Sequence, residues 1–458
     1  MSIFQKKLRE AGGIYELLGI AFPIIASQMS LQLMFFTDRF LLVPLGLAHP
    51  SAALAGGLSS HMFSTLLVGI LTYVTPLTAQ YFGSNQHDKC SLVLTQGLLL
   101  ALLGYPILLL IGYYLAPIYW VWTGLPIEES KLAWNYFSVV NSGIIFNLCN
   151  VAFSSFFSGL GKTQTVMYIN VTGMLLNAPL CYFFIHQSYI PFLSDIRGAA
   201  FGTALSLLAM TLLFFINLSK EQIWQRFFFQ TAWRLDLKVM KKLLRFGTPT
   251  GVEFFLMLFS FTTYVTLFHS YGVTEALAQT IVLNWDMLAF LPLWGLHIGI
   301  MSLSGRYLGA QRIDLALHSV YSGLKIAAVI ASMITLLVFI FTLPMIQIFI
   351  PAGMAPNDEK YLLELAAHML RLVSFYCWAY AVNCVFSAIL RASGDTKICM
   401  YISLAGDMAM LVSNYFLIKY FHVKPEVAWH VFIAFVFFTS FLFLLRFFQG
   451  RWKTLSVI

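Results

Sequence analysis

An acidic residue, Asp38, lies inside an apolar run of helix length that extends from Phe22 to Phe40. A charged side chain costs about 2.5–3.5 kcal/mol at the centre of a bilayer on insertion scales, so such an acid is expected to face a bundle interior or a watery cavity. Loss of water favours the protonated form of a carboxyl group, whereas a ring of neutral oxygens favours a bound hard cation. Either occupant would neutralise Asp38, and Pro23 gives the same helix a place to bend.

Two other roles for Asp38 compete with ion binding: an ion pair with the adjacent Arg39, and a position at the outer membrane interface. Adjacent residues on a helix do not face each other, which argues against the ion pair. If a second ligand bound only one bend of the helix, the two ligands would exclude each other and exchange would follow. We therefore favour a coupling role for Asp38.

Three further polar residues lie in apolar runs. Glu253 follows Pro249, where its alternative role is to interact with the positive dipole at a helix start. Asp286, beside Trp285, would attract a cationic ligand by charge and cation–π attraction, or would only hydrogen-bond within a bundle. Asn150 either lines a cavity or bonds helices together, and we favour bonding.

The composition indicates a membrane protein with many spans. Of 458 residues, 59% are hydrophobic and 10% are charged, whereas soluble domains carry about 25% charged residues. The net charge of +8 does not indicate a nucleic-acid partner, because the basic residues lie in short loops and form no continuous face. The six cysteines form no CxxC pair, and GKT at 161–163 lacks phosphate-loop spacing. We expect no enzyme activity and no cofactor beyond a coupling H⁺ or Na⁺.

The fold class predicted from hydropathy is all-α and polytopic. A helix crosses the hydrocarbon core of about 30 Å at 1.5 Å per residue, so apolar runs of about 20 residues or more mark the spans. About twelve transmembrane helices are predicted, at residues 15–44, 52–82, 92–116, 131–159, 164–186, 197–218, 246–270, 275–304, 316–349, 361–390, 398–420 and 427–447.

Lysine and arginine residues gather in alternate predicted loops, which predicts the orientation. The positive-inside rule places both termini and the charged connector at residues 219–245 in the cytoplasm. We expect an N-lobe at residues 1–218 and a C-lobe at residues 246–458. The connector between them is predicted to be an amphipathic surface helix, or alternatively a solvated loop.

The two lobes repeat each other in sequence. A gap-free alignment pairs Gly161, Thr163, Gly173, Tyr182 and Phe183 with Gly394, Thr396, Gly406, Tyr415 and Phe416, and a second constant spacing pairs Pro23 with Pro249. Such self-similarity indicates a duplication. Each half contains an even number of spans, so we expect two six-helix lobes related by a pseudo-two-fold axis along the membrane normal, with the substrate path between them.

Besides the first span, several short motifs occur along the chain: YFGSNQ (81–86), GLGKT (159–163), NAPLCYFFI (177–185), TPTGVEF (248–254), RYLGAQR (306–312) and ILRASGDTK (389–397). Their order and spacing resemble the multidrug and toxic compound extrusion (MATE) family of cation-coupled antiporters, within the MOP superfamily. The resemblance covers essentially the whole chain. It implies a two-lobed bundle that extrudes drugs or organic cations against entering H⁺ or Na⁺.

The resemblance also implies roles for individual residues. Asp38, Asn177 and Thr203 match the family's N-lobe site for a proton or Na⁺, and Glu253 matches its acid of helix seven. Gln28, in the matching first helix, joins Asn150 and Asp286 as a candidate for substrate contact.

The sequence departs from the family at two positions. Cys181 stands where some members have an aspartate and others a second asparagine. Tyr380 stands near the position of a helix-ten aspartate of the sodium-coupled branch. The choice between H⁺ and Na⁺ therefore stays open.

We predict a secondary active antiporter that exports amphipathic, cationic small molecules, acting as a monomer in a bacterial-type inner or plasma membrane. The main alternative is a flippase of the same superfamily for a lipid-linked precursor, whose cavity should carry Arg or Lys to meet phosphates. The predicted spans hold almost no such residues, with Lys325 and Arg371 as exceptions. A second alternative is a receptor or scaffold that transports nothing. This alternative does not explain why acids would be buried in a duplicated bundle.

Overall fold

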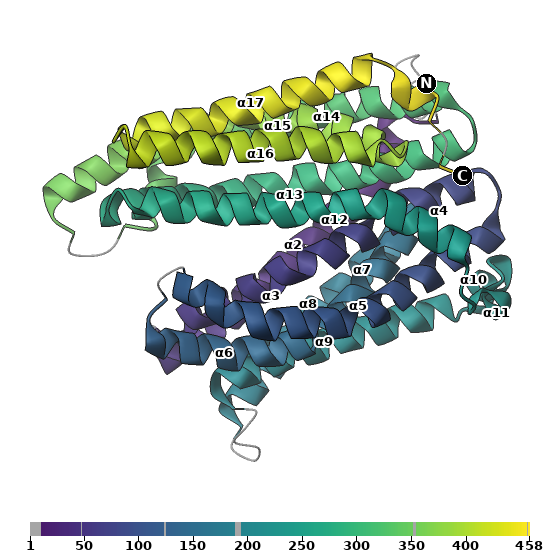
Figure 1. The fold of residues 1–458 in the computed structure, drawn as a ribbon, viewed down its shortest axis with the longest axis horizontal. Coiled ribbons are helices and arrows are strands. Elements are labelled where there is room, and N and C mark those ends of the chain that lie inside the picture. The colour runs from purple at the N-terminus through teal and green to yellow at the C-terminus, as the bar shows by residue number, and fades with distance from the viewer. Residues whose placement is uncertain (1–10, 47, 123–124, 188–193, 351–353, 456) are drawn as a thin grey trace. The chain divides into compact units, whose positions relative to one another are not determined.

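The computed structural model describes residues 11–46, 48–122, 125–187, 194–350, 354–455 and 457–458. Within these ranges the chain forms α-helices and short 3-10 turns and contains no β-strand, which confirms the all-α class (Figure 1). Eleven of the described helices are long and apolar enough to cross a membrane, or up to twelve if one bent pair counts as a single span. The prediction of about twelve spans is therefore confirmed.

The helices up to residue 218 follow the predicted runs, with two interruptions. They are α2 (Ile14–Leu42), α3 (Ala48–Thr72), α4 (Val74–Gly83), α5 (His87–Trp122), α6 (Ile127–Ser142), α7 (Ile144–Gly159), α8 (Thr163–His186) and α9 (Asp195–Leu218). α3 and α4 form one candidate span, whereas α6 and α7 meet at a bend of 48°. The bend falls at Gly143, where an added side chain would collide with Ala204 of α9.

The connector contains two short helices, α10 (Glu221–Arg226) and α11 (Phe229–Ala232), in place of the single predicted helix. Between them Phe228 adopts a left-handed backbone with φ 55°, which a continuous helix does not allow. The next helix, α12 (Leu237–His269), begins inside the predicted connector. Asp236 caps it, because its Oδ1 accepts hydrogen bonds from the backbone N–H groups of residues 238 and 239.

The remaining helices match the predicted runs to within a few residues. They are α13 (Val273–Gly309), α14 (Ile313–Gln347), α15 (Pro356–Ala392), α16 (Thr396–Lys419) and α17 (Pro425–Phe448). In lipid every backbone polar group must find its partner inside the chain, so these apolar runs form helices. The first ten residues, whose basic side chains contribute to the predicted orientation, lie outside the described part.

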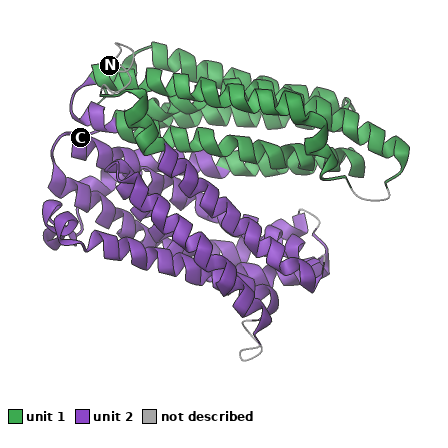
Figure 2. Cartoon of the chain, turned by 180° about the vertical axis from the view of Figure 1, so that it is seen from behind, with its two compact units in different colours: residues 1–21, 256–304, 313–456 green, residues 22–255, 305–312, 457–458 purple. Residues whose placement is uncertain are grey.

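The chain forms two compact units, which Figure 2 shows in different colours. Unit 1 comprises residues 1–21, 256–304 and 313–456, and unit 2 comprises residues 22–255, 305–312 and 457–458. Each unit has its own apolar core, built around Phe156 and Phe214 in unit 2 and around Tyr264 and Trp429 in unit 1. The lobe boundaries drawn from the sequence stay a prediction.

Close packing of α8 against α9 in unit 2 positions the residues that matter below. The two helices lie side by side, and Gly202 of α9 faces the backbone of Cys181 of α8. Gly198, one turn earlier, faces the carbonyl group of Phe184. Small residues allow transmembrane helices to approach closely. Thr203, next to Gly202, is thereby held beside α8.

Candidate functional site

Asp38 is buried within unit 2, with 1% of its surface exposed. The hydroxyl group of Thr203 in α9 donates a hydrogen bond to Oδ2 of Asp38 at 2.5 Å, and the hydroxyl group of Tyr136 in α6 donates to the same oxygen at 3.2 Å. The thiol group of Cys181 in α8 lies 3.2 Å from Oδ1. Three helices besides α2 therefore contribute a donor to one carboxyl group.

Asn177 of α8 completes this arrangement, which we name the Asp38 site. Its side-chain nitrogen lies 3.0 Å from the hydroxyl oxygen of Thr203 and 3.2 Å from the sulfur of Cys181. Its side-chain oxygen is buried and has no hydrogen-bond partner among the described residues. A buried acceptor of this kind normally has a partner, and a proton donor, a water molecule or a cation would each satisfy it. The structure thus brings together Asp38, Asn177 and Thr203.

The structure does not show the alternative ion pair between Asp38 and Arg39. The guanidinium group of Arg39 instead donates to the carbonyl oxygen of Phe35 in its own helix, at 3.1 Å. The burial of Asp38 also argues against a position in open solvent. The acid therefore depends on the Asp38 site for its stabilisation.

A second polar contact joins α2 to α8. The side-chain nitrogen of Asn170 donates to the hydroxyl oxygen of Ser27 at 2.5 Å, and both residues are buried. Ser27 precedes Asp38 by about three helical turns, or about 16 Å along α2. The first span is therefore held by hydrogen bonds at two levels, and Pro23 lies just before the first of them.

Two other predicted residues lie in unit 2 but outside the Asp38 site. Gln28 is half-buried on α2, next to Ser27. Glu253 is buried in α12, with 5% of its surface exposed. Its helix lies close to α3, because Gly251 and Gly69 have no side chains to separate the two backbones. Their roles in substrate contact and ion coupling stay predictions.

Asn150 connects α7 with α9. Its side-chain nitrogen donates to the carbonyl oxygen of Leu207 at 2.9 Å, and its side-chain oxygen accepts from the hydroxyl group of Thr211 at 3.2 Å. Both ends of the amide are thus engaged by α9. This geometry favours the role that bonds helices together, and the role in substrate contact stays a prediction.

Asp286 lies in unit 1, so it belongs to a different unit from the Asp38 site. The hydroxyl group of Tyr376 in α15 donates to its carboxyl group. One turn further along α13, the ring of Phe290 stacks on the ring of Tyr380 at 5.0 Å and on the ring of Trp294 at 5.7 Å. An acid with aromatic faces nearby provides the features that attract an organic cation.

Comparison with known proteins identifies the family. The MatE family model matches residues 23–183 and 249–416 of this chain. The chain belongs to the MatE family. The two matched segments begin at the aligned residues Pro23 and Pro249 and end at the aligned residues Phe183 and Phe416, which supports the duplication.

This MatE protein is similar over nearly its full length to known relatives. It is 25% identical over 460 residues to the probable multidrug resistance protein NorM of Bacillus cereus, which covers 99% of this chain and 97% of the relative. The eukaryotic MATE transporter AtDTX14 has a similar fold, with a TM-score of 0.84, 18% identity and 96% of both chains covered. A crystal structure of MATE in the bent conformation gives a TM-score of 0.82 at 17% identity, with 99% of both chains covered. The chain is thus a membrane transporter and not an enzyme.

Sequence reasoning missed one member of the Asp38 site in this MatE protein, and it noted Cys181 only as a departure from the family. Tyr136 lies 98 residues from Asp38 in the sequence, and no pattern connects the two. The described residues contain no group of three or more His, Cys, Asp or Glu side chains that could hold a metal ion. The neutral oxygens around Asp38 are instead of the kind that accompany a proton or a hard monovalent cation.

Proposed function

We propose that this MATE protein exports amphipathic, cationic small molecules in exchange for protons that bind at Asp38. The observation that carries the proposal is a buried carboxyl group whose hydrogen-bond donors come from three other helices. Relatives named as multidrug resistance proteins support the export of drugs. An antiporter needs such a group, because occupation of the carboxyl must be coupled to the position of its helix.

Opposing effects act on the charge of Asp38. Burial favours the protonated acid, whereas the hydroxyl groups of Thr203 and Tyr136 donate to an oxygen and favour the ionised form. A bound proton turns one carboxyl oxygen into a donor, which must then find an acceptor. The unpartnered oxygen of Asn177 lies within the same site. Protonation would therefore rearrange the hydrogen bonds that hold α2.

A rearranged Asp38 site would allow α2 to change its bend. Pro23 has no backbone N–H and cannot complete the helical hydrogen-bond pattern, so bending at this position costs less than elsewhere. If the drug binds only to the protein with one bend of α2, and the proton only to the protein with the other bend, each ligand displaces the other. Inward flow of protons then drives export of the drug.

Cys181 favours protons over Na⁺ in this proposal. Its sulfur lies 3.2 Å from Oδ1 of Asp38, inside the region where a bound Na⁺ would need ligands. Hard cations prefer oxygen, whereas sulfur is a soft ligand. A proton needs only one acceptor atom and does not require several oxygen ligands.

The Asp286 region is the proposed contact for the cationic part of the drug. Its carboxyl group supplies negative charge, and the stacked rings of Phe290, Trp294 and Tyr380 supply aromatic surface. In the same proposal, the protein acts as a monomer in the plasma membrane. The excess of basic residues in the connector supports a cytoplasmic position for the connector and the termini.

Flux measurements in proteoliposomes test this function. The purified protein is reconstituted, and efflux of a fluorescent organic cation is followed under a proton gradient alone and under a Na⁺ gradient alone. We expect the proton gradient to drive export and Asp38→Asn to abolish it. Glu221→Gln, which changes an exposed acid on α10, is the matched control. Wild-type export by Asp38→Asn, or export driven only by Na⁺, would contradict the proposal.

A further inference from the structure

Two aromatic residues at the end of α4 are each accompanied by two cations. Tyr81 is buried, and the ammonium groups of Lys89 and Lys242 lie 5.6 and 5.4 Å from the centre of its ring. The ammonium group of Lys242 also donates to the hydroxyl oxygen of Tyr81 at 3.2 Å. Aromatic faces attract cations, so this tyrosine holds a lysine of α5 and a lysine of α12 next to each other.

The neighbouring ring of Phe82 has guanidinium groups beside it from two other helices. The central guanidinium carbon of Arg226 in α10 lies 5.7 Å from the ring centre, and that of Arg306 in α13 lies 5.2 Å away. Arg306 also donates to the carbonyl oxygen of Leu160, at 3.1 Å, just after α7. Gly161, which has φ +72°, leaves the space that this guanidinium group fills.

Two further lysines extend this arrangement. Partial burial lowers the pKa of Lys162, and the nearby charges of Arg226 and Lys220 lower the same pKa further. The ammonium group of Lys220 donates to the side-chain oxygen of Asn217 at 2.7 Å. We name the six residues the basic cluster: Lys89, Lys162, Lys220, Arg226, Lys242 and Arg306. All six belong to unit 2.

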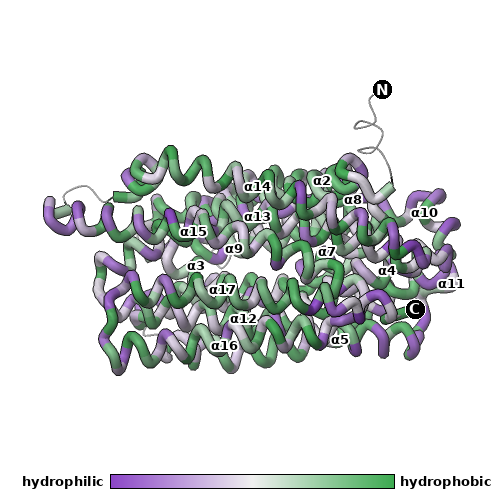
Figure 3. The backbone as a smooth tube through the Cα atoms, turned by 90° about the horizontal axis from the view of Figure 1, so that it is seen from above, coloured by the Kyte–Doolittle hydropathy of each residue, from purple (hydrophilic) through white to green (hydrophobic). Residues whose placement is uncertain are grey.

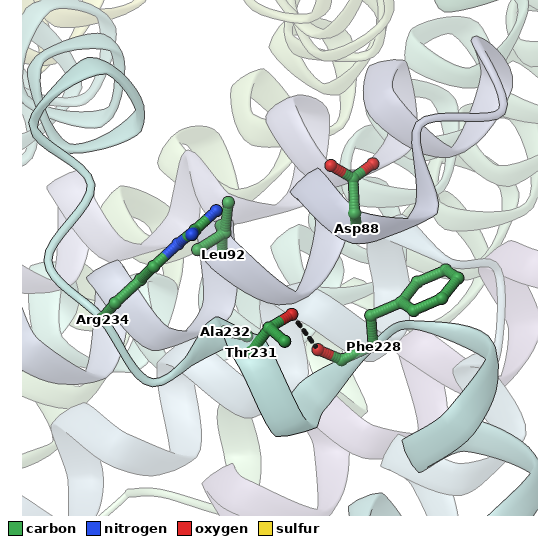
Figure 4. Close-up of a pocket in the computed structure, with 6 residues that line it drawn as sticks. All are labelled: Asp88, Leu92, Phe228, Thr231, Ala232 and Arg234. Atoms are coloured by element: carbon green, nitrogen blue, oxygen red, sulfur yellow. Dashed lines mark hydrogen bonds between the residues drawn. The ribbon is translucent and has the colours of Figure 1, made fainter.

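Fewer acids than cations lie around the basic cluster. The carboxyl groups of Asp88 and Asp236 lie near the side chain of Tyr81. Asp88 also lines a recess of about 390 Å³ together with Arg234 and the connector residue Phe228 (Figure 4). Glu221, beside Lys220 at the start of α10, is a third acid, and three acids do not balance six cations. Like charges that lie close together, as those of Lys162, Lys220 and Arg226 do, repel each other. A bound anion with several oxygens would relieve this repulsion through charge-assisted hydrogen bonds.

Apolar side chains on the connector indicate where such an anion would come from. Phe228 and Trp233 are more than half exposed, as are Leu235 and Leu237. In Figure 3 the backbone around α10 and α11 is mostly hydrophilic. In the sequence that follows, Trp233, Leu235 and Leu237 alternate with charged residues. Exposed aromatic residues beside basic ones are typical of segments that lie at the membrane interface. This combination suits a phospholipid better than a free ion.

The connector is fixed firmly enough to present this surface. The hydroxyl group of Thr95 in α5 donates to the carbonyl oxygen of Ala232 at 2.9 Å. The side-chain nitrogen of Gln96 donates to the backbone carbonyl oxygen of Arg234 at 2.8 Å. The side-chain oxygen of Gln96 accepts from the backbone N–H of Asp236 at 3.2 Å. The charges of the connector are therefore held beside α5.

We propose that the basic cluster binds the phosphate headgroup of an anionic phospholipid, with the apolar residues of the connector against the adjoining lipid. The bound headgroup would join α4, α5, α10, α12 and α13 at one end of unit 2. The proposal does not depend on the identity of the drug or of the coupling ion.

Thermal unfolding in nanodiscs tests the proposal. The wild-type protein is compared in phosphatidylcholine alone and in phosphatidylcholine with added phosphatidylglycerol. We expect phosphatidylglycerol to raise the midpoint temperature of the wild type and to raise it much less in the double variant Lys162→Gln, Arg226→Gln. Lys419→Gln, Lys424→Gln removes two exposed lysines of unit 1 and should respond as the wild type does.

Two further measurements complete the test. Lys220→Gln alone, a change of one exposed lysine, should also reduce the response and replaces the double variant if that variant does not fold. Inorganic phosphate added to the protein in detergent should not reproduce the full shift. If phosphatidylglycerol raised the midpoint temperature of the wild type and of the cluster variants equally, the proposed binding site would be wrong. A full shift with inorganic phosphate would overturn the assignment to a lipid.

Discussion

The sulfur of Cys181 lies 3.2 Å from the carboxyl oxygen Oδ1 of Asp38, so a soft atom stands where a hard cation would need oxygen. Cys181→Asp replaces this sulfur with a second carboxyl group. Two adjacent carboxylates repel each other and are stabilised by a shared cation. We expect export by Cys181→Asp to respond to a Na⁺ gradient at equal pH, measured as drug flux in proteoliposomes.

Cys181→Ser is the matched control for this substitution. It keeps a small donor at the same position and adds no charge. Export by Cys181→Ser should remain driven by a proton gradient. If the serine variant alone became driven by Na⁺, one added oxygen would suffice to change the ion. If Cys181→Asp gained no response to Na⁺, the proposed role of the sulfur would be wrong.

Thr203→Val removes the 2.5 Å hydrogen bond to Oδ2 of Asp38 with little change in volume. Hydrogen bonds to charged groups contribute about 1.5–3 kcal/mol, and 1.36 kcal/mol corresponds to one pH unit. The ionised carboxyl loses this stabilisation, so Asp38 should hold its proton more tightly. We expect the pH at which export is half-maximal to rise by about one unit or more.

Thr203→Ser separates the hydroxyl group from the shape of the side chain. It keeps the donor and should leave the pH profile of export close to that of the wild type. The measurement is the export rate at a series of pH values with a fixed proton gradient. Identical profiles for the wild type and Thr203→Val would mean that this hydrogen bond does not influence the coupling proton.

Gly202→Ala should disturb the contact that places Thr203 beside α8. An added Cβ at residue 202 would lie 2.7 Å from the backbone nitrogen of Cys181 and 2.8 Å from its Cα, and neither atom can move without its helix. Overpacking of this kind costs about 1–3 kcal/mol. We expect a lower midpoint temperature of unfolding in detergent, together with slower export.

Gly19→Ala is the matched control on α2. An added Cβ at Gly19 meets no atom within 4 Å, and alanine favours a helix over glycine by about 1 kcal/mol. This variant should unfold at the wild-type temperature or slightly above it. If both alanine variants behaved alike, the close approach of α8 and α9 would not explain the use of glycine at residue 202.

The spans and the meeting of Asp38, Asn177 and Thr203 were accessible from the sequence for different reasons. Length and hydropathy are local properties, so α8 and α9 begin and end within a few residues of their predicted bounds. The meeting of the three polar residues followed from the family resemblance, which carries information about distant contacts. Their role in coupling stays a prediction.

Other features that depend on contacts between helices, and that the family resemblance did not supply, were not accessible. Hydropathy reports that residues 131–159 can cross a membrane, but it does not report the bend of 48° between α6 and α7. At that bend Gly143 lies against Ala204 of α9, a contact that hydropathy does not report either. The hydrogen bond from Tyr136 to Asp38 likewise exists only after α6 and α2 have packed together.

Asp286 and Tyr376 allow the charge of the proposed drug contact to be separated from its hydrogen bond. Asp286→Asn removes the negative charge and keeps the shape, so export of a cationic dye should fall several-fold more than export of a neutral dye of similar size. Tyr376→Phe removes the donor to the carboxyl group and keeps the charge, so it should spare the preference for cations. Parallel efflux assays with the two dyes give the comparison. If Asp286→Asn reduced export of both dyes equally, Asp286 would instead serve to hold α13 and α15 together. Charge attraction to the drug requires export of the cationic dye to fall more than export of the neutral dye.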